Sequence, residues 1–346
     1  MLILTEKIRS ILKYLILLNV FLIAFIVYQI YYSPYNWSGK NEKDFEVEQG
    51  KTLDEIAFSL KQNDIIPSIL LFKIAVKFSG KENQLISSSY TFKNGMNNIE
   101  LLEILTDKNL VKLTKFTVPE GFTIKQIANL AAKKLNLSGD KFIREASNDS
   151  LIGIIGLKGK IKNLEGFLYP NTYELPKNTT EKKLVQILFN EFQKKFFNNN
   201  KINSNVKEND TLLLNTIILA SIIQGETGMR NEMPVISGVY KNRMKINMKL
   251  EADPTIQYII PDGPRRLLYS DLKINSPYNT YINKGLPPGP VNNPGIDAIL
   301  AALQPDVHNF LFFVATGDGG HKFSENYSQH QQAVKEYRQN QKNKNK

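Results

Sequence analysis

The stretch LLLNTIILASIIQGETGMRNEMP, from Leu212 to Pro234, begins as a long apolar run and ends on a single carboxylate, Glu226. The run is apolar on nearly every side, which is typical of a helix buried inside a larger α+β domain. Thr211 is placed to cap its first turn, and Gly228 to mark its end. A charged residue seldom lies in such a setting without a partner or a task.

The side chain of Glu226 projects from an aliphatic face of this helix, since the residues three, four and seven positions earlier are Ile223, Ile222 and Leu219. Desolvation disfavours the anion there, and the partial negative charge of a helix C-terminus acts in the same direction. Both effects raise the pKa, as general-acid cleavage of a glycosidic bond requires. The plain alternative is an ion pair with Arg230, four residues on.

The composition excludes several classes of function. The 346 residues are 42% hydrophobic and 22% charged, enough for two or three folded units with a sizeable core. Cysteine is absent, so disulfides, thiolate metal sites and cysteine nucleophiles are excluded. His308, His321 and His330 lack ligand spacing, so we expect no metal site and no cofactor. The net charge of +11 comes from scattered lysines, so we expect no nucleic-acid partner.

An uncharged run from Tyr14 to Tyr32 predicts a transmembrane helix, because ~20 such residues cross a bilayer core. A cleaved signal peptide is the alternative, but its apolar core is shorter and its cleavage site needs small side chains, whereas IYYSPYNW is bulky. The aromatic residues suited to the membrane interface are Tyr28, Tyr31, Tyr32 and Trp37.

The charges around this helix predict its orientation. Lys7, Arg9 and Lys13 precede it, and no Lys or Arg follows until Lys40. The positive-inside rule therefore places the N-terminus in the cytoplasm and everything after about Ser33 outside.

A repeat follows the anchor, in which FEVEQGKTLDEIAFSL from Phe45 aligns without gaps with FTVPEGFTIKQIANLA from Phe116. Each copy predicts a short strand, a turn at glycine, a threonine N-cap (Thr52 and Thr123) and an amphipathic helix. The first copy continues into a second helix ending near Phe78, and SSSYTFKNGMNNIELLEILTDKNL predicts a strand and another capped helix. This β-α-α-β order resembles the LysM module, which binds glycans containing N-acetylglucosamine. The alternative is a packing unit that binds nothing.

The larger domain begins near residue 111 and contains several motifs rich in Gly, Pro and Tyr. NLEGFLYPNTYEL, residues 163–175, predicts an ordered loop or short strand pair, and a helix follows over 181–197. LEADPTIQY, SPYNTYINKGLPPGPVNNPG and FLFFVATGDGGHKFSENYSQH offer aromatic faces and amide groups of the kind that line carbohydrate clefts. The candidate substrate-binding residues are Gln224, Thr227, Asp253, Tyr278, Asn279, Tyr281, Asn293 and His321.

Two of these candidates have plain structural alternatives. Asp253 can instead cap the turn before Pro254, and His321 can make a structural hydrogen bond to the backbone.

Five motifs, ASIIQGET, ADPTIQY, SPYNTY…GLPPGPVNNPG, LEGFLYPNTY and GGHKFSENYSQH, together resemble the MltG/YceG-like endolytic murein transglycosylases over nearly the whole chain. The resemblance implies a bacterial enzyme, anchored in the cytoplasmic (inner) membrane with an extracytoplasmic catalytic domain. Such an enzyme cuts nascent peptidoglycan strands internally and limits their length. The family's catalytic glutamate falls on Glu226. Many members carry an acidic residue two positions earlier, where this chain has Gln224.

The resemblance also implies the chemistry. One residue, Glu226, would protonate the oxygen between N-acetylmuramic acid and N-acetylglucosamine and then deprotonate the muramoyl 6-hydroxyl, giving a 1,6-anhydro end. The alternatives are a glycan hydrolase, with Asp253 or another carboxylate activating water, and a non-catalytic wall-binding scaffold. The expected partners are peptidoglycan strands, the membrane and other proteins of wall synthesis.

The predicted organisation has five parts. They are a cytoplasmic N-terminus and anchor (1–33), a linker (34–43), a LysM-like subdomain (44–110), a catalytic domain (111–338) and a basic tail (339–346).

Overall fold

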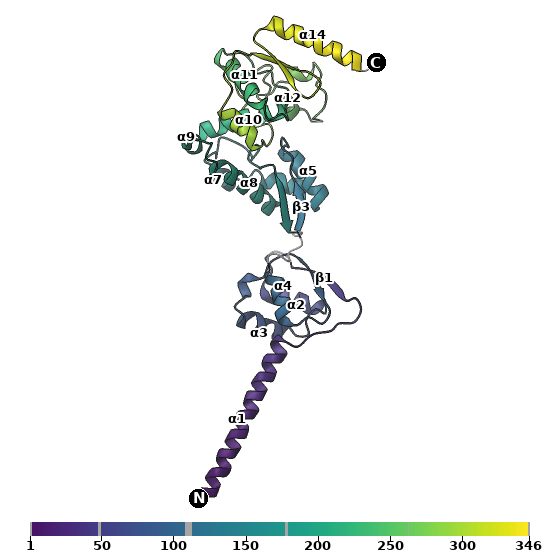
Figure 1. Cartoon of the computed structure of the whole chain (residues 1–346), viewed down its shortest axis with the longest axis vertical. Helices are drawn as coiled ribbons and strands as arrows, with labels where there is room; N and C mark the ends of the chain where they lie inside the picture. Colours follow the sequence, from purple (N-terminus) through teal and green to yellow (C-terminus); the bar gives the residue numbers. More distant parts are fainter. Residues whose placement is uncertain (1, 48–49, 108–112, 177–178, 262, 345–346) are drawn as a thin grey trace. The chain divides into compact units, whose positions relative to one another are not determined.

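The computed structural model describes residues 2–47, 50–107, 113–176, 179–261 and 263–344. It is a mixed α and β fold, as the sequence predicts, and it divides into two compact units (Figure 1). One unit comprises Met1–Lys115 with Glu174–Thr179, and the other comprises Phe116–Tyr173 with Thr180–Lys346. The predicted boundary between residues 110 and 111 lies outside the described residues.

The first unit begins with the long helix α1 (Leu2–Tyr31), which Figure 1 shows leading into the small folded part. Its segment Ile11–Tyr31 is long and apolar enough to cross a membrane, and its side chains from Ile11 to Tyr28 are exposed. This is the segment in which the uncharged run predicted an anchor.

The small folded part has the predicted order of strand, two helices and strand. β1 pairs antiparallel with β2, with Phe45 opposite Tyr90. Thr52 caps the first helix through a capping box with Glu55, which confirms the predicted N-cap. The elements are β1 (Glu42–Glu46), α2 (Leu53–Gln62), α3 (Ile69–Phe78), the 3-10 turn η1 (Glu82–Gln84), β2 (Ser89–Lys93) and α4 (Asn98–Thr106).

Trp37 belongs to the core of this small unit, so its predicted place in an interfacial aromatic belt is wrong. Its side chain is 6% exposed and packs in one cluster with Ile30 and Phe72. Its indole N–H donates to the carbonyl of Lys40 at 2.8 Å. The side-chain amide of Asn98 donates to the carbonyl of Ile30 at 2.6 Å. The end of α1 and the segment that was predicted to be a linker are therefore part of the folded unit.

The second unit begins with the other copy of the repeat. Gly121 has a φ of +78°, and Thr123 caps α5 through a capping box with Gln126, so the predicted turn and N-cap are confirmed. β3 (Leu113–Thr117) pairs with β4 (Thr172–Pro176), and the division between the two units falls within both strands. The first helices of the second unit are α5 (Ile124–Leu135), α6 (Gly139–Glu145), α7 (Asp149–Ile154) and α8 (Glu181–Phe197). The last of these helices has the bounds that the sequence predicts.

The helix α10 (Asp210–Glu226) lies at the centre of this unit and packs against four other helices. Eight of its residues are buried, which explains why the sequence is apolar on most sides. Its N-cap is Asn209, whose side chain accepts from two backbone amides, and not Thr211 as predicted. The surrounding elements are α9 (Ser204–Glu208), α11 (Met233–Lys245), α12 (Asp253–Ile259) and α13 (Ile296–Leu303), with a 3-10 turn η3 at Asp271–Lys273.

The chain ends in a hairpin and a helix. β5 (Phe312–Ala315) pairs antiparallel with β6 (His321–Ser324), and α14 (Tyr327–Lys344) follows. Residues 339–344 of the predicted basic tail therefore continue a helix, and residues 345–346 lie outside the described part.

Candidate active site

Glu226 is the last residue of α10, and its side chain is half-buried. The helix ends because Thr227 is extended, with φ −145° and ψ 145°, so Gly228 does not end it in the way predicted. The Thr227 hydroxyl accepts a hydrogen bond from the backbone amide of Met229 at 3.0 Å. On α11, Tyr240 donates its hydroxyl to Oε1 of Glu226 at 2.5 Å. The hydroxyl of a buried tyrosine thus fixes the position of the Glu226 carboxylate.

The pKa of Glu226 is raised from 4.5 to about 7. Burial is the largest cause, and the negative charge of Asp253 adds to it. The hydrogen bond from Tyr240 and the positive charge of Arg243 act in the opposite direction. A group with this pKa populates both its acid and its base form near neutrality, so it can donate a proton and then accept one.

The alternative of an ion pair between Glu226 and Arg230 is wrong. Nε of Arg230 instead lies 2.9 Å from Oδ2 of Asp297. An ion pair with Arg230 therefore does not lower the pKa of Glu226.

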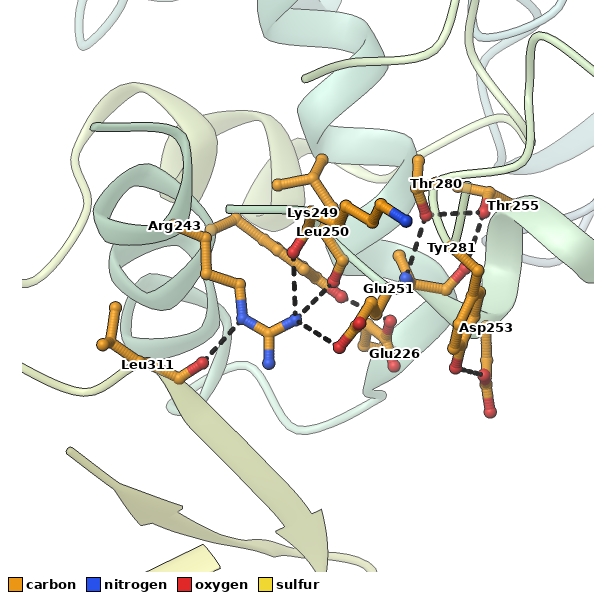
Figure 2. Close-up of polar contacts among 12 residues, drawn as sticks. Glu226, Arg243, Lys249, Leu250, Glu251, Asp253, Thr255, Thr280, Tyr281 and Leu311 are labelled. Carbon is orange, nitrogen blue, oxygen red and sulfur yellow. Dashed lines mark hydrogen bonds and ion pairs between the residues drawn. The ribbon is translucent and has the colours of Figure 1, made fainter. Parts of the chain in front are cut away.

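Sequence reasoning missed Tyr240 and Arg243, which lie on one face of α11. Arg243 is 7% exposed, and its guanidinium donates to the carbonyls of Leu311 at 2.6 Å and Leu250 at 2.7 Å. In the view of Figure 2, Glu226 lies between Arg243 on one side and Asp253 on the other. The sequence signal that could have identified Tyr240 and Arg243 is their spacing of three residues, which places both side chains on the same side of a helix.

Asp253 and Tyr281 form a second polar pair beside Glu226 (Figure 2). The hydroxyl of Tyr281 donates to Oδ1 of Asp253 at 2.5 Å. Asp253 is exposed at the first position of α12 and makes no side-chain cap, so it does not take the capping role considered from the sequence. The backbone amide of Ala252 donates to the Thr280 hydroxyl at 3.0 Å, and that hydroxyl lies 2.9 Å from the Thr255 hydroxyl. These bonds fix the loop of Tyr281 against the start of α12.

Asn279 and Asn293 are fully buried and shape loops, so they do not reach a substrate as predicted. The amide of Asn279 donates to the carbonyl of Leu272 at 3.0 Å. The amide of Asn293 donates to the carbonyl of Phe122 at 2.9 Å, and its oxygen accepts from the backbone amide of Leu168 at 2.8 Å. Asparagine supplies both a donor and an acceptor, which suits it to such backbone contacts.

Gln224 and Tyr278 also make contacts within the protein. The side-chain oxygen of Gln224 accepts from the backbone amide of Gly295 at 2.9 Å and ties that loop to α10. The half-buried ring of Tyr278 lies 5.0 Å from the ring of Tyr258. Of the predicted substrate-binding residues, Thr227, Asp253 and Tyr281 are the ones that the structure places around Glu226.

His321 is held by Glu232 at the start of β6. Its Nδ1 lies 2.7 Å from Oε2 of Glu232, and its backbone amide donates to Oε1 at 2.8 Å. The partner is thus a carboxylate and not the backbone considered from the sequence. No group of three or more His, Asp or Glu residues in the described ranges has the geometry of a metal site.

The chain is similar to known proteins in sequence. The sequence matches the YceG-like family over residues 45–336. The endolytic murein transglycosylase of Bacillus subtilis (strain 168) is 30% identical over 326 residues, which cover 91% of this chain and 90% of that protein. The endolytic murein transglycosylase of Streptococcus pneumoniae serotype 2 (strain D39 / NCTC 7466) is 26% identical over 333 residues, covering 88% of this chain and 60% of that protein.

The fold has a solved counterpart as well. A yceG-like protein from Listeria monocytogenes has a crystal structure that matches with a TM-score of 0.57 and 25% identity, covering 85% of this chain and 99% of that one. The predicted family is thereby confirmed by sequence and by fold: the chain belongs to the YceG-like family.

Proposed function

We propose that the protein is a membrane-anchored endolytic murein transglycosylase that cleaves peptidoglycan strands between N-acetylmuramic acid and N-acetylglucosamine. One observation carries the proposal. The half-buried carboxyl group of Glu226, with a pKa raised to about 7, lies where the ASIIQGET motif resembles the family's catalytic segment. The names of the relatives from Bacillus subtilis and Streptococcus pneumoniae support the same activity.

In the proposed reaction, Glu226 first acts as a general acid. Its proton passes to the glycosidic oxygen, and the bond from that oxygen to the anomeric carbon breaks. The resulting carboxylate then takes the proton of the muramoyl 6-hydroxyl, whose oxygen attacks the anomeric carbon. The products are a 1,6-anhydro end and a new free 4-hydroxyl, with no water consumed.

Tyr240 and Asp253 have opposite effects on this proton transfer. The Tyr240 hydroxyl stabilises the carboxylate form, whereas the charge of Asp253 favours the protonated form. We assign to Asp253 and its partner Tyr281 the support of positive charge on the sugar ring in the oxocarbenium-like transition state. Thr227 supports the reaction by closing the turn after Glu226.

Asp253 also supports a second candidate function. A carboxylate close enough to raise the pKa of Glu226 can activate a water molecule, and the protein would then be a glycan hydrolase. The product separates the two, because hydrolysis leaves a reducing sugar and not an anhydro ring.

The remaining parts receive their proposed roles from the sequence. We assign anchoring in the bacterial cytoplasmic membrane to residues 1–33, with the N-terminus inside. Residues 44–110 would form the LysM-like unit that contacts glycan, and residues 111–338 would perform the chemistry outside the cytoplasm. Other proteins of wall synthesis are the proposed partners, because a cleaving enzyme anchored in the membrane would encounter new glycan strands during their synthesis at the membrane.

The test uses the full chain in detergent, because a start near residue 40 would remove Trp37 from the core of the small unit. Peptidoglycan strands are incubated with the wild type, with Glu226→Gln and with Glu174→Gln, a control at an exposed position on β4. Mass analysis should find anhydro-ended fragments with the wild type and the control but not with Glu226→Gln. Reducing ends would support the hydrolase, and no cleavage by the wild type would support a scaffold.

A further inference from the structure

A cavity of ≈ 920 Å³ lies beside the catalytic helix but does not include Glu226. Gly225, the preceding residue, forms part of its wall. Consecutive helical residues project about 100° apart, so the cavity and the catalytic carboxylate are reached from different sides of the last turn of α10. The other walls come from α5 and the turn before it, from α6, from α12 and the segment after it, and from the loop segments 163–165 and 291–292. A ligand in this cavity could be bound while a glycan lies at Glu226.

The wall of this cavity combines amide groups with apolar surface. Ile143, 38% exposed on α6, and Val291 contribute aliphatic surface, and Tyr258 contributes a ring. Side-chain amides both donate and accept, which matches the alternating groups of a peptide backbone. Gln257 already uses both of its groups on the backbone of Arg265, and the oxygen of Gln126 accepts from the backbone amide of Thr123. The carboxamide side chains are Gln126, Asn129, Asn163, Gln257 and Asn292.

One of these amides has an unused acceptor. Asn292 is 5% exposed, and its amide nitrogen donates to the carbonyl of Ser221 at 2.7 Å. Its Oδ1 is buried and accepts no hydrogen bond from any residue in the described part of the chain. A buried acceptor without a donor is costly, and Asn292 is one of the residues that line the cavity.

The charge of the wall favours an anionic ligand. Lys125 and Glu165 are the ionisable groups of opposite sign among the described residues that line the cavity. Glu165 is buried, and burial raises its pKa to about 8, although the backbone amide of Ile124 and the side chain of Asn293 donate to it. Its protonated form is therefore favoured at neutral pH, and the side chain of Lys125 is exposed.

We propose that this cavity binds the peptide arm that N-acetylmuramic acid carries next to the scissile bond. The inference rests on the proposed function, because it takes peptidoglycan as the substrate. The arm branches from the sugar whose bond is cut, carries free carboxylates and presents backbone amides. A cavity that adjoins Glu226 without containing it fits a branch of the polymer, whereas the glycan backbone itself must pass the carboxylate.

The test measures binding and does not depend on cleavage. Full-length Glu226→Gln protein in detergent is titrated with a disaccharide-peptide released from peptidoglycan and with the same disaccharide after removal of its peptide. The peptide-bearing ligand should bind more tightly. Lys125→Ala with Asn129→Ala should weaken its binding about tenfold, since two polar contacts are lost. Lys133→Ala, which changes a lysine on the same helix outside the cavity, is the matched control.

Two results would overturn the assignment. Equal affinity for the peptide-bearing and the peptide-free disaccharide would show that the protein does not bind the peptide. If the paired substitutions weaken the peptide-free disaccharide as much as the peptide-bearing one, the cavity holds sugar and not peptide. Anhydro ends are scored separately on wild-type protein, so a failure of the proposed chemistry is distinguishable from a failure of this binding site.

Discussion

The substitution Tyr240→Phe removes one hydroxyl group from the site and should shift the pH dependence of cleavage upward. That hydroxyl is the hydrogen-bond donor to Glu226, and it stabilises the carboxylate form. The pKa of Tyr240 is itself raised well above 10, chiefly by burial, so the phenol stays a neutral donor throughout the working pH range. Phenylalanine keeps the ring and its contact with Phe313.

The size of the shift follows from the strength of the lost bond. A hydrogen bond to a charged group contributes about 1.5–3 kcal/mol, and one pKa unit corresponds to about 1.36 kcal/mol. The pKa of Glu226 should therefore rise from about 7 to between about 8 and about 9. Since the protonated form starts the reaction, the alkaline limb of kcat/KM should move up by the same amount.

The assay is the rate of anhydro-end formation at low substrate concentration across a pH series. Tyr173→Phe is the matched control, because it removes a buried phenol that donates at 2.5 Å to the carbonyl of Tyr169 and not to Glu226. An alkaline limb that stays in place or moves down in Tyr240→Phe, with the protein folded, would show that Glu226 is not the acid whose titration limits the rate.

Three further predictions follow from the same geometry. Asp253→Asn should lower the alkaline limb, the opposite direction, because the charge that favours protonated Glu226 is lost. In wild type the folded-state pKa of Glu226 is raised from 4.5 to about 7, so the stability that is fully present below pH 4.5 is lost as pH rises through about 7. In chemical denaturation, Glu226→Gln should be more stable than wild type by up to about 3 kcal/mol near pH 9 and equal to it near about pH 4. Gly166→Ala, where φ is +88° and an added Cβ would meet a proline atom at 2.6 Å, should cost about 1–3 kcal/mol more than Gly159→Ala, where φ is +80° and the space is open, in thermal unfolding.

Local signals in the sequence were sufficient for much of the fold. The capped turns at Thr52 and Thr123 were readable because a capping residue and its helix are adjacent in the chain. The raised pKa of Glu226 was predictable because the aliphatic residues around it in sequence lie within two turns of the same helix. In each case the residues that determine the local structure are close in sequence to the residue whose position was predicted.

The errors concern contacts between distant segments. Asn293 was expected in a cleft, but its amide binds Phe122, 171 residues away, so no local pattern could show that it is buried. Tyr240 was missed because its partner Glu226 lies across a turn on another helix, 14 residues earlier. Trp37 was expected at the membrane surface because it is an aromatic residue just beyond the apolar run, yet it belongs to the core of the small unit.

The burial of Ile30 and Trp37 has a mechanical consequence for a helix proposed to cross the bilayer. No slack chain separates the end of α1 from the small unit, because the carbonyl of Ile30 is already bonded to Asn98. The anchor and the small unit should therefore move as one lever. A change in bilayer thickness or helix tilt would therefore shift or tilt the small unit directly. The anchor would then fix the distance of the small unit from the membrane surface, in addition to tethering it.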